Sequence, residues 1–232
     1  MAIAANEGFS LLSSNIKSAY LQGQSLQRKV YVLPPPEAKE HGKLWLLEKG
    51  DGLIDGSRLF FIELKKTLER LGMRALSGDS AFFTCHKAGK LLGFICIYVD
   101  DLLMCGNRDF EKLIVDKLMK QFKFSKLERG KFSYLECKIE RKENGDISLN
   151  QNTYIEKIEE ITVPIRSNDC WVRDYVRKEI RRVVGELLWV SMNQLSSKIL
   201  NATVREVKDA RRLVIKAKTK SSQDLGIKQT WR

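Results

Sequence analysis

Two adjacent acidic residues, Asp100 and Asp101, are the side chains best suited to chemistry in this sequence. They separate two strongly apolar stretches, residues 91–99 and 102–105, so we expect them at the tip of a β-hairpin. Carboxylates this close repel each other, and a divalent cation bound between them relieves the repulsion. The alternative is an ordinary exposed turn, because Asp is common in turns and a bare Asp-Asp pair favours nothing more.

The surrounding segments predict an α+β fold made of antiparallel hairpins and helices. Strands are expected at residues 29–33, 44–47, 81–85, 91–99, 102–105, 134–139 and 147–149. Apolar residues recur at helical spacing over 57–71, and Gly72 follows where a helix C-cap would lie. A second helix should run to about residue 122, capped by Asn107 or Asp109.

Positive charge is concentrated in the last third of the chain, which we expect to be helical. The net charge is +12, and residues 163–232 hold sixteen Lys or Arg against seven Asp or Glu. This distribution predicts two domains, residues 7–162 and a basic segment over 163–232. Such a basic segment indicates a polyanionic partner such as nucleic acid, although a solvated basic surface is the plainer alternative.

The remaining composition excludes several classes of protein. Five cysteines without CxxC spacing indicate free thiols in a reducing compartment, not a disulfide framework or a zinc site. No apolar run is long enough to span a membrane, and the N-terminus does not resemble a signal peptide. We therefore expect an intracellular protein, cytoplasmic or nuclear, with no membrane partner; its oligomeric state is left open.

Taken in order, a series of short motifs resembles the reverse transcriptases of copia-type retrotransposons. The series is KSAYLQG (17–23), VYV (30–32) with Pro34 and Pro35, LWLL (44–47), GL (52–53) with Arg58, DSAFF (79–83), YVDD (98–101), FSYL (132–135), QNTYI (151–155) and VGELLW (184–189). Each motif alone is weak, but their order over most of the chain is specific.

This resemblance implies a polymerase palm, an antiparallel sheet backed by helices, followed by a helical basic connection segment. It also implies an RNA-directed DNA polymerase that uses a two-Mg²⁺ site, with an RNA template, a DNA primer and a dNTP as partners. Asp100 and Asp101 would be metal ligands, and the backbone carbonyl of Ile16 would face a metal.

The same resemblance assigns further residues. Tyr20 would lie under the incoming sugar and exclude a 2′-hydroxyl, although residue type alone favours a core aromatic. The other nucleotide-binding residues would be Tyr98 and Arg58, and Tyr134 and Leu135 would bind the primer. The nucleic-acid contacts expected on the basic segment are Arg177, Lys178, Arg181, Arg182, Arg211 and Arg212.

The sequence departs from the family pattern at the first catalytic position, where Asn15 replaces aspartate. An amide oxygen can ligate magnesium but adds no charge, so we expect a severe fall in metal affinity and turnover. Asp51 stands where the family usually has an aromatic residue, and Glu136 where it has glycine. The fingers and ribonuclease H segments of relatives have no counterpart, which implies a truncated copy.

Three functions follow from these observations. The first is a reverse transcriptase domain weakened or inactivated at Asn15. The second is a non-catalytic nucleic-acid-binding protein that uses the basic segment. The third is a transposon remnant with no function.

Overall fold

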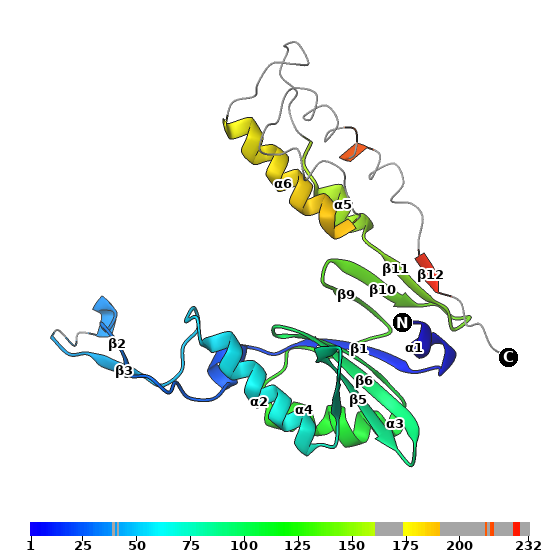
Figure 1. Ribbon diagram of the computed structural model, residues 1–232, viewed down its shortest axis with the longest axis horizontal. Coiled ribbons are helices and arrows are strands. Elements are labelled where there is room, and N and C mark those ends of the chain that lie inside the picture. Colours follow the sequence, from blue (N-terminus) through cyan, green and yellow to red (C-terminus); the bar gives the residue numbers. More distant parts are fainter. Residues whose placement is uncertain are drawn as a thin grey trace, which may run out of the picture. The chain divides into compact units, whose positions relative to one another are not determined.

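The computed structural model describes residues 1–38, 40, 42–160, 174–190, 212, 214–215 and 225–227. The chain forms two compact units that divide between Phe132 and Ser133, inside one strand (Figure 1). Each unit combines an antiparallel sheet with helices, which agrees with the expected α+β class. The domain boundary predicted at 162–163 lies outside the described residues.

A six-stranded antiparallel sheet organises the first unit. Its spatial order is β4 (Arg74–Leu76), β5 (Asp79–Lys87), β6 (Lys90–Tyr98), β7 (Asp101–Gly106), β1 (Ser10–Asn15) and β8 (Glu128–Arg129). The predicted hairpin is confirmed as β6 and β7, joined by a two-residue turn at Val99 and Asp100. β1, which the sequence did not predict, lies between β7 and β8.

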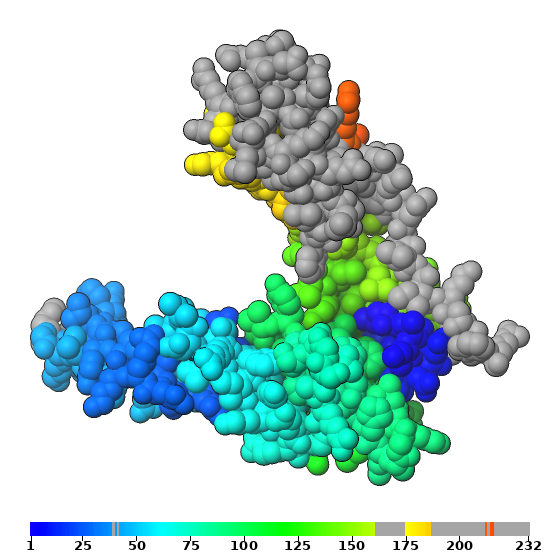
Figure 2. Space-filling model, viewed as in Figure 1, coloured from blue at the N-terminus to red at the C-terminus, as the bar shows by residue number. Residues whose placement is uncertain are grey.

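Helices and one face of this sheet enclose the core of the first unit. They are α2 (Gly56–Arg70) and a continuous helical stretch made of α3 (Arg108–Phe110), a π-helical turn (Glu111–Val115) and α4 (Asp116–Gln121). The largest fully buried members of the core are Phe60, Phe83, Phe110, Leu12, Ile16, Leu64, Leu68, Ile95, Leu102, Met104 and Ile114. Figure 2 shows α2 in cyan beside the surface of β5 and β6.

Both predicted helix ends are confirmed. Gly72 has a φ of +88° and donates its N–H to the Glu69 carbonyl, as a C-capping glycine does. At the second helix, the Asn107 side-chain oxygen accepts a hydrogen bond from the Phe110 N–H at 2.9 Å.

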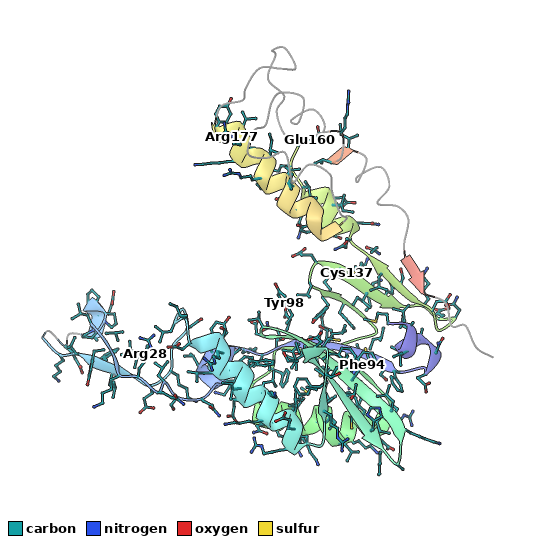
Figure 3. The ribbon with its side chains drawn as sticks, viewed as in Figure 1. Arg28, Phe94, Tyr98, Cys137, Glu160 and Arg177 are labelled. Atoms are coloured by element: carbon teal, nitrogen blue, oxygen red, sulfur yellow. The ribbon has the colours of Figure 1, made fainter. Side chains whose placement is uncertain are left out.

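The first unit also contains α1 (Ala2–Asn6), the 3₁₀ turns η1 (Ala19–Gln22) and η2 (Pro36–Ala38), and a small sheet. That sheet pairs β2 (Val30–Val32) with β3 (Trp45–Leu47), which confirms both predicted strands. Arg28, labelled in Figure 3, forms a 2.7 Å ion pair with Asp55, the residue that precedes α2.

The second unit has its own sheet, in the order β12 (Leu225–Ile227), β11 (Ile147–Asn150), β10 (Cys137–Arg141) and β9 (Lys131–Tyr134). Its helices are α5 (Asn152–Lys157) and α6 (Asp174–Val190). The expected helical character after residue 150 is wrong at β12, where the chain returns as a strand against β11.

The strand predicted over 134–139 is also wrong, because it is interrupted by a turn. Leu135 and Glu136 have φ values of +50° and +60°, which is the left-handed pair that a two-residue type I′ hairpin requires. Because the side chains on both sides of this turn are apolar, the sequence predicted one continuous strand. Among the described residues, no helix is both long and apolar enough to cross a membrane.

Candidate metal and nucleotide site

Asn15 and Asp101 are directly opposite each other on the neighbouring strands β1 and β7. The Ile16 N–H donates to the Asp100 carbonyl at 2.9 Å, so Asn15 and Asp101 form a non-hydrogen-bonded pair, in which side chains approach most closely. The Asn15 Nδ2 donates to Asp101 Oδ1 at 3.1 Å. The two positions therefore share one site, although 86 residues separate them along the chain.

The turn that carries Asp100 is strained. Val99 has a φ of +56°, a conformation that β-branched residues adopt rarely and at a cost of about 1–3 kcal/mol. Val99 is also exposed, at 46%, so no burial of its own side chain offsets that cost. The surrounding strands hold this turn in place, and the turn brings the two carboxylates to the end of the sheet.

Tyr98 lies on the same face of the sheet as Asp101. The two residues are paired across β6 and β7, and Cys96 and Phe94 follow Tyr98 on that face because side chains alternate along a strand. Figure 3 labels Tyr98 and Phe94. Tyr98 is 53% exposed and could contact a ligand. Burial raises the pKa of the Cys96 thiol to about 11, which makes this cysteine a neutral side chain, not a nucleophile.

The backbone of Ile16 faces Asp100, to whose carbonyl its N–H donates at 2.9 Å. On the other side of this strand, the Lys17 N–H donates to the Lys123 carbonyl and the Asn15 carbonyl accepts the Ser125 N–H. Backbone polar groups alternate in direction along an extended chain. The N–H and carbonyl of Ile16 consequently face the turn that holds Asp100.

Tyr20 and Arg58, which were predicted to bind the nucleotide, belong to the helical part of the first unit. Tyr20, in η1, packs against the core and is partly buried. A methyl group placed on Gly56, at the start of α2, would lie 3.5 Å from the Tyr20 Cβ. Arg58 is exposed in the first turn of α2. The packing of Tyr20 is compatible both with a core aromatic and with a half-buried floor for a ligand.

Ser125 is a residue of this site that the sequence analysis missed. Its N–H donates to the Asn15 carbonyl at 2.8 Å, and its Oγ accepts the Asn15 N–H at 3.1 Å. Its Oγ also lies 3.2 Å from the Oγ of the buried Ser14. Ser125 therefore fixes the backbone of position 15 from the side opposite Asp101. Nothing in the local sequence indicates this, because the partners are 110 residues apart.

The charges present do not match a pair of divalent cations. Asp100 and Asp101 supply two negative charges, and the Asn15 amide directs an N–H, which has no lone pair for a metal, at Asp101. The opposite amide orientation would set two oxygen atoms against each other. Within the described part of the chain, no group of three His, Cys, Asp or Glu side chains could hold a metal ion.

The residues predicted to contact nucleic acid and primer lie in the second unit. Lys178, Arg181 and Arg212 are exposed and Arg177 is partly buried, whereas Arg211 lies outside the described residues. Tyr134 ends β9 and Leu135 begins the turn after it.

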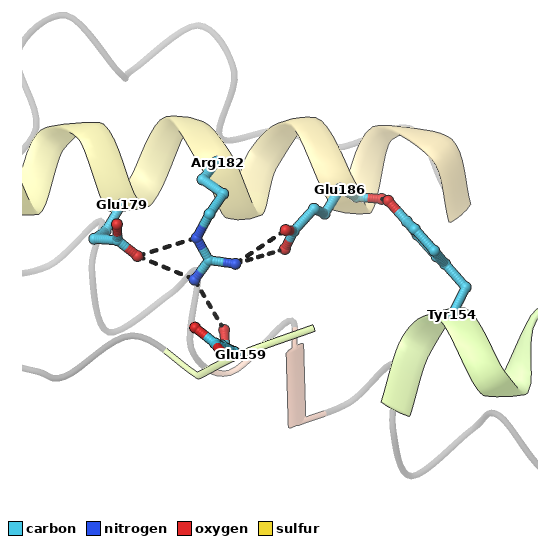
Figure 4. A network of polar contacts seen from close by, with 5 residues as sticks. All are labelled: Tyr154, Glu159, Glu179, Arg182 and Glu186. Atoms are coloured by element: carbon cyan, nitrogen blue, oxygen red, sulfur yellow. Dashed lines mark hydrogen bonds and ion pairs between the residues drawn. The ribbon is translucent and has the colours of Figure 1, made fainter. Parts of the chain in front are cut away.

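The guanidinium of Arg182 is held by hydrogen bonds within the second unit (Figure 4). Its guanidinium donates to both carboxylate oxygens of Glu186, at 3.0 and 2.9 Å, and to Glu179 at 3.1 Å. It also reaches the Glu159 carbonyl at 3.5 Å, which links α6 to the chain after α5. Burial lowers the Arg182 pKa, but the hydrogen bonds that the guanidinium donates to Glu186 and Glu179, together with their charges, outweigh this and raise it. Two carboxylates thus compete with any phosphate for this arginine.

Comparison with known proteins gives one family and two related sequences. The family model described as "Reverse transcriptase (RNA-dependent DNA polymerase)" matches residues 1–170. Two Arabidopsis thaliana proteins, "Retrovirus-related Pol polyprotein from transposon RE1" and "from transposon RE2", are 27% and 26% identical over 111 residues. Each alignment covers 46% of this chain, and 7% and 8% of the respective relatives. The chain thus matches less than a tenth of the length of these polyproteins.

Proposed function

The chain belongs to the reverse transcriptase family, and from this premise we propose that it is the RNA-directed DNA polymerase domain of a copia-type retrotransposon with its chemistry weakened at Asn15. In this proposal the six-stranded sheet is the polymerase palm. Asp100 and Asp101 are its remaining acidic residues, and an RNA template, a DNA primer and a dNTP are its substrates.

The observation that carries the proposal is the pairing of position 15 with Asp101. A polymerase palm needs its first acidic position beside its Asp-Asp turn, and here β1 and β7 bring the two together. The amide at position 15 explains why the activity should be low. Two carboxylates balance only half the charge of two divalent cations, and electrostatic stabilisation provides most of the catalysis in phosphoryl transfer.

Primer extension tests this function. The wild-type chain and the Asn15→Asp variant are compared on an RNA template with a DNA primer, in Mg²⁺ and in Mn²⁺. We expect extension near background for the wild type and a clear gain for Asn15→Asp. Asn15→Ala is the matched control, since it removes the amide without adding charge, and it should stay at background.

A second substitution excludes a contaminating polymerase. Asp100→Asn, introduced into the Asn15→Asp variant, should abolish the gain. If Asn15→Asp extends no primer and binds no Mg²⁺ by calorimetry, the assignment of this site is wrong.

The exposed cations of α6 favour a second candidate function, nucleic-acid binding without catalysis. Lys178 and Arg181 are exposed on the same helix and could each contact a phosphate. A protein that neutralises several phosphates loses affinity steeply with salt, at about −0.9 per contact on a log–log plot for duplex DNA. Lys178→Gln with Arg181→Gln should reduce that slope by about 2. Lys87→Gln, at an exposed strand end of the first unit, is the control. A flat salt response in the wild type would exclude this candidate.

A further inference from the structure

The loop over residues 17–23 connects the strand of Asn15 to the region of α2, and one side chain holds it in place. Gln22 donates its Nε2 to the Lys17 carbonyl at 2.6 Å and to the Lys123 carbonyl at 3.3 Å. Its Oε1 accepts the Lys123 N–H at 2.7 Å. The amide of Gln22 thus bonds to the backbone of Lys123 in both directions, as a residue on a neighbouring strand would.

The rest of the loop leaves little freedom for another conformation. Ser18 enters it with a φ of +48°, which L-residues other than Asn and Asp seldom adopt. Gly23 leaves it against α2, where a Cβ would lie 2.7 Å from the Phe60 nitrogen and 2.8 Å from the Phe60 Cα. No side chain fits at position 23 without moving the helix. Between these two fixed points, Gln22 supplies the side-chain bonds to residue 123.

Tyr20 lies in this loop, two residues before Gln22. Its ring packs on the core and beside the start of α2, so the depth of the ring depends on where the loop lies. Phe122, which precedes Lys123, contacts Phe60 of α2 edge-on, with ring centroids 6.2 Å apart. Lys123 is therefore a fixed anchor, and Gln22 transmits that position to the loop.

We infer that Gln22 is the positioning residue of the 17–23 loop and, through it, sets the place of Tyr20 and the selection between deoxyribose and ribose. This inference rests on the proposed function and on the role that the resemblance implies for Tyr20, under the sugar of the nucleotide. Gln22 itself need not touch the nucleotide. It holds the loop so that the ring of Tyr20 remains at one height above the core.

The chain offers a matched control two residues away. Gln24 belongs to the same connection, but its Nε2 donates to Glu63 of α2 at 3.1 Å and not to residue 123. Gln22→Ala and Gln24→Ala therefore remove the same group from the same connection, and only the first removes side-chain bonds to Lys123. The backbone bond from the Lys17 N–H to the Lys123 carbonyl stays in both variants.

The experiment has two readouts. Amide hydrogen exchange of the wild-type chain should show a protected Lys123 N–H, with protection lost in Gln22→Ala and kept in Gln24→Ala. In the Asn15→Asp background, calorimetric titration with dATP and with ATP, in the presence of a primer–template and Mg²⁺, gives the sugar selectivity. We expect Gln22→Ala to lower the dATP to ATP affinity ratio by about fivefold, the effect of one or two hydrogen bonds, and Gln24→Ala to leave it unchanged.

The Tyr20→Ala variant separates failure of this inference from failure of the proposed function. If Tyr20→Ala lowers the ratio and Gln22→Ala does not, the role of Gln22 is overturned while the function stands. If Tyr20→Ala leaves the ratio unchanged, the inference is overturned, and if neither nucleotide binds, the proposed function is overturned with it. Unchanged exchange at Lys123 in Gln22→Ala would overturn the inference whatever the selectivity.

Discussion

Replacing Asn15 with aspartate should make the folding stability of the first unit depend on metal. In the wild-type chain the Asn15 Nδ2 donates to Asp101 Oδ1 at 3.1 Å, so the pair attracts without a cation. The variant places two carboxylates on a non-hydrogen-bonded strand pair, whose Cα atoms lie about 4.5 Å apart. Charges at about 4 Å repel by about 1 kcal/mol in bulk water and about 4 kcal/mol at a dielectric of about 20.

Both side chains are half-buried, which puts the repulsion between those limits. With about 1 kcal/mol for the lost hydrogen bond, we expect Asn15→Asp to lose about 2–5 kcal/mol of unfolding free energy in EDTA. A cation that binds only the folded chain returns stability by mass action, about 2.7 kcal/mol at a hundred times its Kd. Magnesium should therefore restore most of the loss.

Thermal unfolding followed by circular dichroism measures this effect, with MgCl₂ titrated against NaCl of matched ionic strength. The wild type should respond equally to both salts, and Asn15→Ala should be less stable by about 1 kcal/mol with no specific response to magnesium. If Asn15→Asp is as stable as the wild type in EDTA and magnesium acts on it only as NaCl does, positions 15 and 101 do not form a common site.

Three further predictions follow from single contacts. Ser125→Ala leaves the Asn15 N–H without its acceptor and should cost about 1–3 kcal/mol in urea unfolding, whereas Ser125→Thr should keep most of the stability. Glu136→Gly should stabilise the second unit by about 1 kcal/mol, since glycine adopts a φ of +60° without strain. The substitution also removes the ion pair with Lys157, but that pair is exposed and contributes less. A net loss of stability would contradict this account of the turn. Burial raises the Cys96 pKa from 9.0 to about 11, so the folded thiol stays protonated where the unfolded thiol ionises. The stability that the neutral, buried thiol contributes is therefore lost as the pH rises from about 9 to 11. Its alkylation by iodoacetamide in the folded chain should accelerate over the same range, and a rate that levels off near pH 9 would contradict the shift.

The elements of the first unit that could be predicted are those with a local signal. The spacing of apolar residues marked α2, Gly72 and Asn107 marked helix ends, and the apolar runs around Asp100 marked the β6–β7 hairpin. β1 was missed for a physical reason. Its four middle residues are all buried, as in a central strand, so the alternation that identifies a half-exposed strand is absent.

Only those residues of the site that belong to a family motif could be predicted from the sequence. The resemblance placed Asn15 and Asp101 in one site, and the strand register agrees with that placement. Ser125 and Gln22 could not be found this way, because each acts by bonding to backbone more than a hundred residues distant. Backbone bonds of this kind depend on where the chain passes and not on the residue types at their far end.

The two departures from the family pattern with a structural consequence have opposite effects on the fold. Asn15 replaces a charge with an amide of nearly the same shape and turns a repulsion with Asp101 into a hydrogen bond, so it stabilises the metal-free chain. Glu136 places a side chain where the backbone needs a φ of +60°, so it strains the β9–β10 turn. The loss of catalysis that we propose at position 15 is therefore compatible with an intact sheet, including the costly turn at Val99. Purified wild-type protein that is folded but inactive would be the natural result of the first change, while any loss of stability should be traced to the second unit.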